Sequence, residues 1–317
     1  MLRTPFSLVC FIALASAAKN GPSHLDTLVT FGDSYTDAVV TGDNATAWPV
    51  YAAGYAHATL RPFARSGGTC TNTLTPRTFP SVMESQVPLY LEEVRNRSLR
   101  VDYEKALYTL WIGTNDLGPN TLLTGDEVMP NATIASVTAC TIDWAKELYA
   151  TGVRNFLFQN IIPLERLPIY SVDSYPNRYW TAERNTTEWH LFIHELAVAG
   201  NTISRLMWES LPAKLPHAHI GYFDSHALFT DILDDPRKFL NGTLASPNIT
   251  GAINACVFQL NESTSGPADC TVAQGSDRDS FMWYDELHPS EQVDRVVARE
   301  IAAVLEGRGS KYATWFS

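Results

Sequence analysis

The sequence predicts an α/β fold, a three-layer doubly wound domain with a mainly parallel, five-stranded sheet covered by helices on both faces. Three observations lead to this prediction. Short apolar runs alternate with amphipathic helical patterns, neither a linker nor a repeat interrupts the alternation, and polar residues follow the apolar runs where strands would end. One domain is therefore expected over residues 18–317.

Strand and helix signals succeed one another along the chain. Apolar runs rich in β-branched and aromatic residues are typical of buried parallel strands, and they lie at residues 28–31, 107–112, 156–162 and 220–223. Apolar residues spaced three or four apart are typical of amphipathic helices, and they lie at residues 137–148, 189–207 and 293–305. Gly152 marks the end of the first of these helices, and Pro163 stops the third strand.

The composition is that of an ordinary globular protein. The 317 residues are 45% hydrophobic and 18% charged, which excludes collagen-like, coiled-coil and disordered chains. Asp and Glu number 34 against 23 Lys and Arg, so the net charge of −11 repels phosphate backbones and anionic lipid. We therefore expect no nucleic-acid partner.

Residues 1–17 have the pattern of a secretory signal peptide. Arg3 precedes an apolar run at 6–15, and the small residues at 15–17 form a cleavage site. The run is too short to span a bilayer, and no later run approaches the roughly 20 apolar residues that a span requires. The sequence therefore predicts a secreted, extracellular protein with no membrane span.

Cysteines and glycosylation sequons support the same compartment. Removal of the signal peptide leaves four cysteines, which allow two disulfides in three connectivities. The pair Cys256 and Cys270 is close in sequence and is the favoured bridge, which leaves Cys70 and Cys140 for the other. Seven N-x-Ser/Thr sequons predict a glycoprotein. Their asparagines are Asn44, Asn96, Asn131, Asn185, Asn241, Asn248 and Asn261.

Residues with catalytic potential follow the predicted strands, where doubly wound proteins bind their ligands. Ser34 lies on a tight Gly-Asp-Ser turn after the first strand, which exposes its hydroxyl and backbone N–H, although such turns also serve as plain helix caps. Asn115 follows the second strand and offers an amide donor. Between them, Gly67 and Gly68 permit close backbone approach to a cleft.

An Asp-x-x-His sequence stands near the C-terminus, directly before the last predicted helix. Asp285 and His288 are three residues apart on a loop, so that one turn can bring the carboxylate against the imidazole. The second ring nitrogen then faces outward as a base. Taken alone such a pair is usually structural, but here it completes a set of four signals at predicted strand ends.

The order serine, glycine, asparagine, then Asp-x-x-His resembles the SGNH/GDSL hydrolase superfamily over essentially the whole mature chain. The resemblance implies a flavodoxin-like fold with Ser34 as the nucleophile, although Tyr35 stands where the superfamily usually has leucine. It also implies Asp285 and His288 as the partners of the nucleophile in a catalytic triad.

The same resemblance assigns the oxyanion hole. Gly67 matches the oxyanion glycine, with Gly68 as the alternative register, and Asn115 matches the oxyanion asparagine. The backbone N–H of Ser34 is the third donor. The mechanism implied is acyl transfer through an acyl-enzyme, which uses neither a metal nor an organic cofactor.

The residues flanking these motifs narrow the resemblance. Phe-Gly-Asp-Ser-Tyr-Thr, Ser-Gly-Gly-Thr-Cys and Trp-Tyr-Asp-Glu-Leu-His-Pro resemble secreted fungal acetylesterases of carbohydrate esterase family sixteen, while plant-type secreted esterases and lipases share much of the pattern. The resemblance implies a monomeric serine esterase that hydrolyses short acetyl esters on plant-wall carbohydrates or oligosaccharides. Its partner is then a small ester or an acetylated saccharide.

Aromatic residues near the motifs are candidates for substrate binding. They offer apolar faces on which a sugar ring can stack, although aromatic residues that pack on the domain would give the same pattern. The candidates are Trp283, Tyr284, Tyr179 and Trp180.

Other functions remain as alternatives. Within the enzymes the rival is a GDSL lipase or lysophospholipase that acts on longer acyl chains, and outside them it is a catalytically silent carbohydrate-binding glycoprotein on the same fold. A glycosidase pair drawn from Asp33, Asp37 and Asp116 is less favoured because Asp33 and Asp116 lie in turn motifs. His190 and His194 have metal-ligand spacing but no glutamate between them, so we expect ordinary helix histidines.

Overall fold

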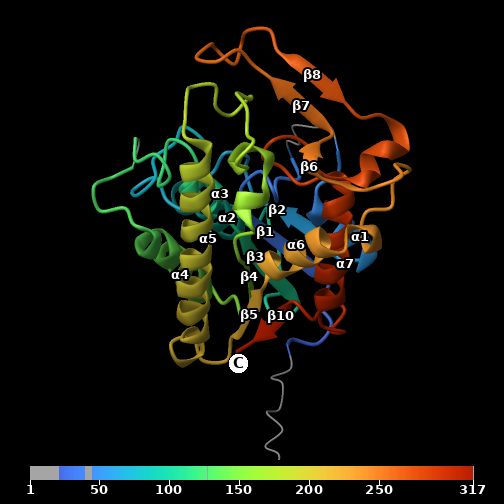
Figure 1. Cartoon of the computed structure of the whole chain (residues 1–317). Helices are drawn as coiled ribbons and strands as arrows, with labels where there is room; N and C mark the ends of the chain where they lie inside the picture. Colours follow the sequence, from blue (N-terminus) through green and yellow to red (C-terminus); the bar gives the residue numbers. More distant parts are fainter. Residues whose placement is uncertain (1–20, 40–44, 127, 317) are drawn as a thin grey trace, which may run out of the picture.

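The computed structural model describes residues 21–39, 45–126 and 128–316, so the predicted signal peptide at 1–17 and the sequon at Asn44 lie outside the described residues. A central sheet is covered on both faces by helices (Figure 1). Its strands are β1 (Thr27–Gly32), β2 (Thr59–Pro62), β3 (Ala106–Trp111), β4 (Asn155–Gln159), β5 (His219–Phe223) and β10 (Ala313–Trp315).

The sheet has the doubly wound order that the sequence predicted. Its strands lie in the order β10-β5-β4-β3-β1-β2, and all neighbours are parallel except β10, which runs antiparallel to β5. The parallel part, 2-1-3-4-5, is the flavodoxin-like order. Because the direction of strand addition reverses beside β1, the carboxyl ends of β1 and β3 border a crevice in which ligands bind.

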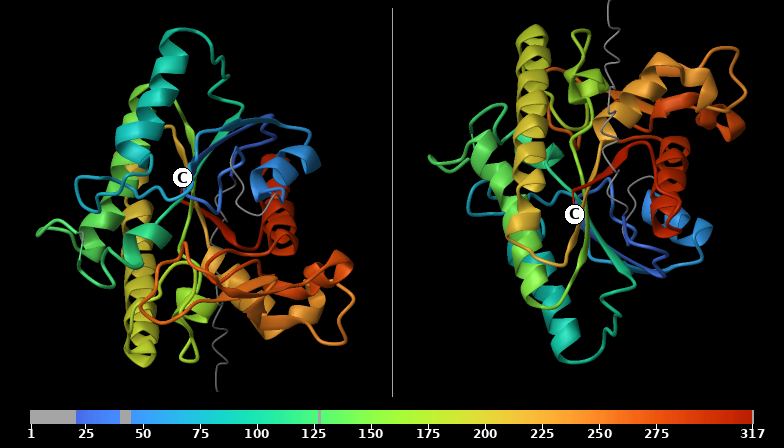
Figure 2. Two further views of the ribbon diagram at one scale, coloured as in Figure 1. Left: turned by 90° about the horizontal axis from the view of Figure 1, so that it is seen from above. Right: turned by 90° about the horizontal axis from the view of Figure 1, so that it is seen from below.

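Helices form a layer on each side of the sheet. Views from above and below show α2, α4 and α5 on one face and α1, α6 and α7 on the other (Figure 2). The helices are α1 (Trp48–Tyr55), α2 (Val87–Arg95), α3 (Thr114–Leu117), α4 (Ile134–Ala150), α5 (Thr186–Glu209), α6 (Ser225–Asp234) and α7 (Glu291–Leu305). None of the helices within the described ranges combines the length and the hydrophobicity that crossing a bilayer requires.

Short elements complete the chain. A π-helical turn at Val82–Gln86 precedes α2. Single turns of 3₁₀ helix lie at Leu164–Arg166, Pro168–Tyr170, Leu211–Ala213, Pro236–Lys238 and Gly275–Ser280. Outside the main sheet, β6 (Asn248–Ala252) pairs with β9 (Phe281–Trp283), and β7 (Asn254–Val257) pairs with β8 (Asp269–Val272).

Local sequence explains where the long helices begin. Asn185 accepts a hydrogen bond from the backbone of Glu188 and caps α5, and Ser290 caps α7 in the same way through Val293. Thr133 and Ser136 form a capping box at the start of α4. The three helices predicted from periodicity are therefore confirmed.

The sheet differs from the prediction in one respect, because it has six strands where five were expected. The sequence gives little signal for the extra edge strands. β2 is four residues long, partly exposed and ends in Pro62, and β10 is only three residues long. Edge strands need not bury both faces, so they lack the continuous apolar runs that identified β1, β3, β4 and β5.

The core consists of two apolar clusters, one on each face of the sheet. Successive strand residues point to opposite faces, so β3 sends Leu107 into one cluster and Tyr108 into the other. On the first face Trp48 of α1 packs in the cluster of Leu107. On the second, Trp144 of α4 meets Phe31 of β1 edge to face, with ring centroids 5.6 Å apart. These clusters fix the strand ends that carry polar residues.

Two disulfides are present among the described residues. Cys256 and Cys270 are directly opposite one another on β7 and β8, and their bridge closes that two-stranded ribbon. Cys70 and Cys140 join the loop after Gly67 to α4. The connectivity is the one that sequence proximity favoured.

Gly32, at the end of β1, is tightly packed where the turn that carries Ser34 begins. Its φ is +143°, and a Cβ there would lie 2.1 Å from the carbonyl oxygen of Trp111. We expect Gly32→Ala to lower the free energy of unfolding by at least about 2 kcal/mol, measured by urea denaturation. Gly54→Ala is the matched control, because its Cβ would meet nothing within 4 Å. A gain of about 0.5–1 kcal/mol is expected there, and equal losses at both positions would contradict the argument.

Candidate active site

The residues singled out in the sequence converge on one cavity at the carboxyl edge of the sheet. Ser34 follows β1, Asn115 is the second residue of α3, the short helix that follows β3, and His288 lies on the loop between β9 and α7. All three line a cavity of about 410 Å³. Gly67 contributes to the same wall.

A continuous hydrogen-bond chain runs from Asp285 to Ser34. His288 Nδ1 lies 3.0 Å from Asp285 Oδ1, and His288 Nε2 lies 2.8 Å from Ser34 Oγ. With Nδ1–H directed at the carboxylate, Nε2 accepts the hydroxyl proton of Ser34. This geometry lets the imidazole act as a general base toward the serine.

The loop that carries Asp285 and His288 is closed by its own backbone. Asp285 Oδ1 accepts the backbone N–H groups of Leu287 and His288 at 2.9 and 2.8 Å. Burial acts to raise the pKa of Asp285, but the charge and hydrogen bonds of His288 and a hydrogen bond from the Tyr179 hydroxyl lower it to about 2. The carboxylate is therefore ionised throughout the neutral range.

Tyr35 connects the turn that carries Ser34 to this loop. Its hydroxyl donates to the carbonyl oxygen of Leu287 at 2.8 Å, and its ring meets that of His288 edge to face. The leucine that usually follows the nucleophile in the superfamily has no hydroxyl to make this bond. Tyr35, which stands in place of the usual leucine, therefore adds a hydrogen bond between the two loops.

Hydrogen-bond donors surround the position beside the Ser34 hydroxyl. Arg77 donates to Asn115 Oδ1 at 2.7 Å, and Asn115 Nδ2 donates to the carbonyl of Gly68 at 2.9 Å. Because a guanidinium only donates, the amide oxygen must face Arg77, which leaves the second N–H of Nδ2 available. Arg77 was not singled out in the sequence, since a loop arginine carries no motif.

Gly67 suits an oxyanion donor better than the alternative, Gly68. The N–H of Gly68 is used by the carbonyl of Arg65 at 3.1 Å, whereas within the described residues no partner is recorded for the N–H of Gly67 or of Ser34. Gly67 has φ +76°, and a Cβ there would collide with the ring of Phe79. Only glycine fits this position without strain.

Buried acids fix the loops around the cavity. Asp37 Oδ2 accepts the backbone N–H and the hydroxyl of Ser66 at 2.8 and 2.9 Å, which holds the segment before Gly67. Asp116 accepts from Cys70 N and from Thr75 Oγ1. Asp33, Asp37 and Asp116 are not among the residues that line the cavity, so the structure does not favour a glycosidase pair drawn from these three.

Gln86 holds the turn that precedes Ser34. Its amide accepts from Gly32 N at 3.0 Å and donates to Gly32 O at 2.7 Å, so one buried side chain satisfies both backbone groups of that residue. No sequence signal marked Gln86, because it lies 54 residues from Gly32.

The aromatic candidates divide between the cavity and the core. Tyr179 and Tyr284 line the cavity. The prediction for Trp283 is wrong, since its side chain is fully buried and its indole donates to the carbonyl of Ile249. Trp180 is also a correction, because it packs against Trp189 and is not among the cavity-lining residues.

The two helix histidines have separate partners. His190 Nδ1 lies 3.2 Å from the carbonyl of Tyr170, and His194 Nδ1 lies 3.4 Å from Glu165. Over the residues that the structure describes, no three His, Cys, Asp or Glu side chains gather as a metal site would require.

Residues 28–301 match the family described as GDSL-like lipase/acylhydrolase. The chain belongs to this family. It is a carboxylic ester hydrolase on an SGNH-type α/β fold, and its fold and family were both predicted from the sequence.

Named relatives include acetylesterases. An acetylesterase from Hypocrea jecorina is 27% identical over 361 aligned residues, which cover 99% of each chain. An acetylesterase from Thermothelomyces thermophilus is 24% identical over 77% of this chain and 68% of its own. A GDSL esterase/lipase from Arabidopsis thaliana is 24% identical over 52% of this chain and 42% of its own.

Solved structures of carbohydrate esterases are also similar. A family 2 carbohydrate esterase from Corynascus thermopiles (Myceliophthora fergusii) is 17% identical with a TM-score of 0.40, covering 90% of this chain and 68% of that one. A family two carbohydrate esterase from Clostridium thermocellum is 12% identical with a TM-score of 0.39, covering 90% and 65%.

Asp33, beside Ser34, is expected to make the stability of this hydrolase depend on pH. Burial raises the pKa of Asp33 to about 7, against the partial opposition of a hydrogen bond from Tyr35 N and of the charge on His288. A raised carboxyl pKa favours folding when the group is protonated, so its contribution is complete below the unfolded pKa near 3.8 and is lost as pH rises through 7.

We expect Asp33→Asn to gain stability relative to the wild type as pH rises from 5 to 8. The gain should be about 2 kcal/mol, measured by urea unfolding across that range. Asp143→Asn is the control, because Asp143 is exposed in a surface pair with Lys146. Parallel stability curves for wild type and Asp33→Asn would show that Asp33 is ionised when buried.

Proposed function

We propose that this hydrolase is a secreted serine esterase that removes acetyl groups from plant-wall carbohydrates or oligosaccharides. The observation that carries the proposal is the hydrogen-bond chain from Asp285 through His288 to Ser34. It ends at a cavity where the described residues offer no hydrogen-bond partner to the backbone N–H of Ser34 or Gly67. Such a chain is what an activated serine nucleophile requires.

In the proposed first half-reaction, His288 Nε2 takes the hydroxyl proton of Ser34 as Oγ attacks the ester carbonyl. Asp285 keeps the imidazole in the required tautomer and stabilises its positive charge. The protonated His288 then gives its proton to the leaving alcohol, the carbon–oxygen bond of the ester breaks, and an acyl-Ser34 enzyme remains.

The tetrahedral intermediate carries its negative charge on the former carbonyl oxygen. We assign the backbone N–H groups of Ser34 and Gly67 and the Nδ2 group of Asn115 as its donors. Arg77 supports this role, since it holds the amide oxygen of Asn115 away from the developing negative charge.

The second half-reaction reverses the roles. His288 removes a proton from a water molecule, the hydroxide attacks the acyl-enzyme, and the proton passes to Ser34 Oγ as the carboxylic acid is released. Each step balances with substrate, water and these side chains alone.

Two observations support acetyl esters of carbohydrates as the substrate class. The relative from Hypocrea jecorina that aligns over 99% of the chain is named an acetylesterase. The cavity also has exposed aromatic surface at Phe79 and half-buried rings at Tyr179 and Tyr284, which suit stacking against a sugar. A lipase or lysophospholipase is the alternative within the family, and a silent carbohydrate-binding protein is the alternative outside catalysis.

The proposal includes secretion, with 1–17 as the signal peptide and 18–317 as a single, monomeric catalytic domain. Two disulfides support an oxidising compartment. Most sequons in the described residues are also accessible for glycosylation. Exposed asparagines are Asn96, Asn131, Asn185, Asn241 and Asn261, and Asn248 is half-buried.

Ser34→Ala tests the nucleophile. We expect a loss of at least about 10³-fold in kcat on a generic acetyl ester, because only the attacking hydroxyl is removed. The melting temperature should be unchanged within a few degrees. Ser265→Ala, at an exposed position, is the control. Mass spectrometry should detect an acetyl adduct on Ser34 in the wild type, and near-normal turnover by Ser34→Ala would refute the assignment.

Acyl-chain length tests the substrate class. A site built for acetyl should lose kcat/KM from acetate through butyrate to octanoate esters. A site with a long apolar groove would instead gain from each buried methylene, worth about 0.8 kcal/mol. A parallel panel of acetylated oligosaccharides checks the acceptor. A higher kcat/KM on octanoate esters would favour the lipase alternative, and no hydrolysis of any ester would favour the silent binder.

A further inference from the structure

We propose that Tyr179 is a positioning residue of the active site, whose hydroxyl holds the Asp285 carboxylate in the orientation that His288 requires. The inference rests on the proposed serine mechanism and adds a fourth member to its hydrogen-bond chain. From the sequence, Tyr179 was a candidate for stacking on substrate. Its contacts assign its hydroxyl a different role.

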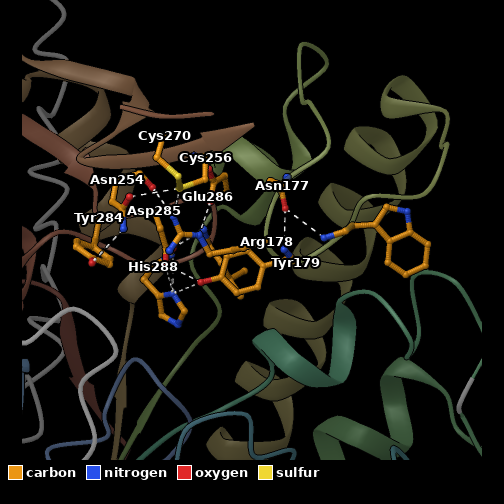
Figure 3. Close-up of polar contacts among 12 residues, drawn as sticks. Asn177, Arg178, Tyr179, Asn254, Cys256, Cys270, Tyr284, Asp285, Glu286 and His288 are labelled. Carbon is orange, nitrogen blue, oxygen red and sulfur yellow. Dashed lines mark hydrogen bonds and ion pairs between the residues drawn. A yellow bond between two sulfur atoms is a disulfide. The ribbon is translucent and has the colours of Figure 1, made fainter. Parts of the chain in front are cut away.

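The hydroxyl of Tyr179 reaches the part of Asp285 that the backbone does not. It donates to Asp285 Oδ2 at 2.6 Å, whereas the backbone N–H groups of the loop both donate to Oδ1. The same Tyr179 oxygen lies 3.0 Å from His288 Nδ1 (Figure 3). One phenol therefore contacts both the carboxylate and the imidazole that the carboxylate orients.

Tyr179 is held rigidly because it belongs to a tight turn, residues 175–180. Asn177 is fully buried at the centre of this turn. Its side-chain oxygen accepts from Tyr179 N at 3.0 Å, and its Nδ2 donates to the carbonyl of Tyr175 at 2.9 Å. Asn177 and Trp180 also pair through their backbones. A side chain on so constrained a turn can fix a partner at low entropic cost.

The 175–180 turn also binds Glu286, the residue next to Asp285. Glu286 has no exposed side chain, and its carboxylate accepts from Arg178 Nε at 3.1 Å and from the Tyr175 hydroxyl at 3.0 Å. It also accepts from the backbone of Cys256 at 2.7 Å. Adjacent residues 178 and 179 of the turn thus bind adjacent acids 286 and 285 of the catalytic loop, as Figure 3 shows.

In this arrangement, different residues anchor the catalytic loop and orient the Asp285 carboxylate. The Arg178–Glu286 pair neutralises a buried acid and anchors the turn to the loop, so the cost of burying each charge is offset by its partner. Tyr179 is neutral and leaves Asp285 its charge, while a hydrogen bond to a carboxylate is among the stronger ones in proteins. The pair sets the distance between the segments, and the phenol sets the angle of the carboxylate.

The electrostatic surroundings give the inference a distinctive readout. Titratable groups face Asp285 and His288 from the nucleophile turn, from the 175–180 turn and from the catalytic loop itself. They are Asp33, Tyr35, Tyr175, Arg178, Tyr179 and Glu286. Of these, Tyr179 alone is recorded as donating to the Asp285 carboxylate within the described residues. When the Tyr179 hydroxyl is removed, the Asp285 carboxylate loses a hydrogen bond. Its charge then stabilises the protonated imidazole of His288 more strongly.

Tyr179→Phe tests the inference, because it removes the hydroxyl and keeps the ring. We expect kcat on an acetyl ester to fall about 10- to 100-fold with KM changed less than about twofold. The acid limb of the kcat/KM profile should move to higher pH. Tyr179→Leu, which also lacks the hydroxyl, should show the same displacement of the limb. Tyr149→Phe is the matched control, since its hydroxyl binds the carbonyl of Pro216 at the surface.

A double-mutant cycle distinguishes positioning from a general loosening of the fold. If Tyr179 acts through Asp285, then Tyr179→Phe should cause little further loss in an Asp285→Asn background. Near-UV circular dichroism confirms folding of each variant. A rise in KM alone would make Tyr179 a substrate contact, and an unmoved acid limb, or a full loss in the Asp285→Asn background, would also overturn the inference.

Failure of the proposed function would look different. In that case the wild type itself would not hydrolyse esters or form an acyl-enzyme. If the wild type is active and Ser34→Ala is not, the serine mechanism stands whatever Tyr179→Phe does. The two proposals are therefore tested separately by the same set of proteins.

Discussion

One hydrogen bond, from Ser34 Oγ to His288 Nε2, joins residues 254 positions apart, and the architecture of the site follows from the need to keep it at 2.8 Å. Ser34 follows the end of β1, which lies between β3 and the edge strand β2, while His288 precedes α7, which packs with α1 on one face. Two rigid elements in contact can hold such a distance. Tyr35 adds a direct tie across the same gap.

Buried carboxylates hold several of the loops around the cavity in place. Asp37 holds the segment before Gly67, Asp116 holds the loop at Cys70, and Glu286 holds the 175–180 turn. An acid is costly to bury, but each of these accepts hydrogen bonds that loop backbones would otherwise lack. Around the cavity, hydrogen bonds to these buried carboxylates therefore hold the loops in place where regular secondary structure is absent.

Much of this could be predicted from residues near one another in sequence. The apolar runs at 28–31 and 107–112 predict strands because a doubly covered strand must be apolar on both faces. Ser34, Asn115, Asp285 and His288 were recognisable because each is embedded in a short motif at a strand end or before a helix. Edge strands β2 and β10 were not, since neither is buried enough to leave an apolar signature.

The sequence by itself determined the family, the doubly wound fold and the residues of the proposed triad, because local patterning and motifs carry that information. Only the tertiary structure decided which side chains support them. Gln86 and Arg77 act on partners 54 and 38 positions away, and nothing in their own neighbourhoods marks them. Tyr179 was marked only as an aromatic residue for stacking, because the partner of its hydroxyl lies 106 positions away. Burial of Trp283 was likewise decided by packing, since an aromatic residue beside a motif has the same sequence whether it faces cavity or core.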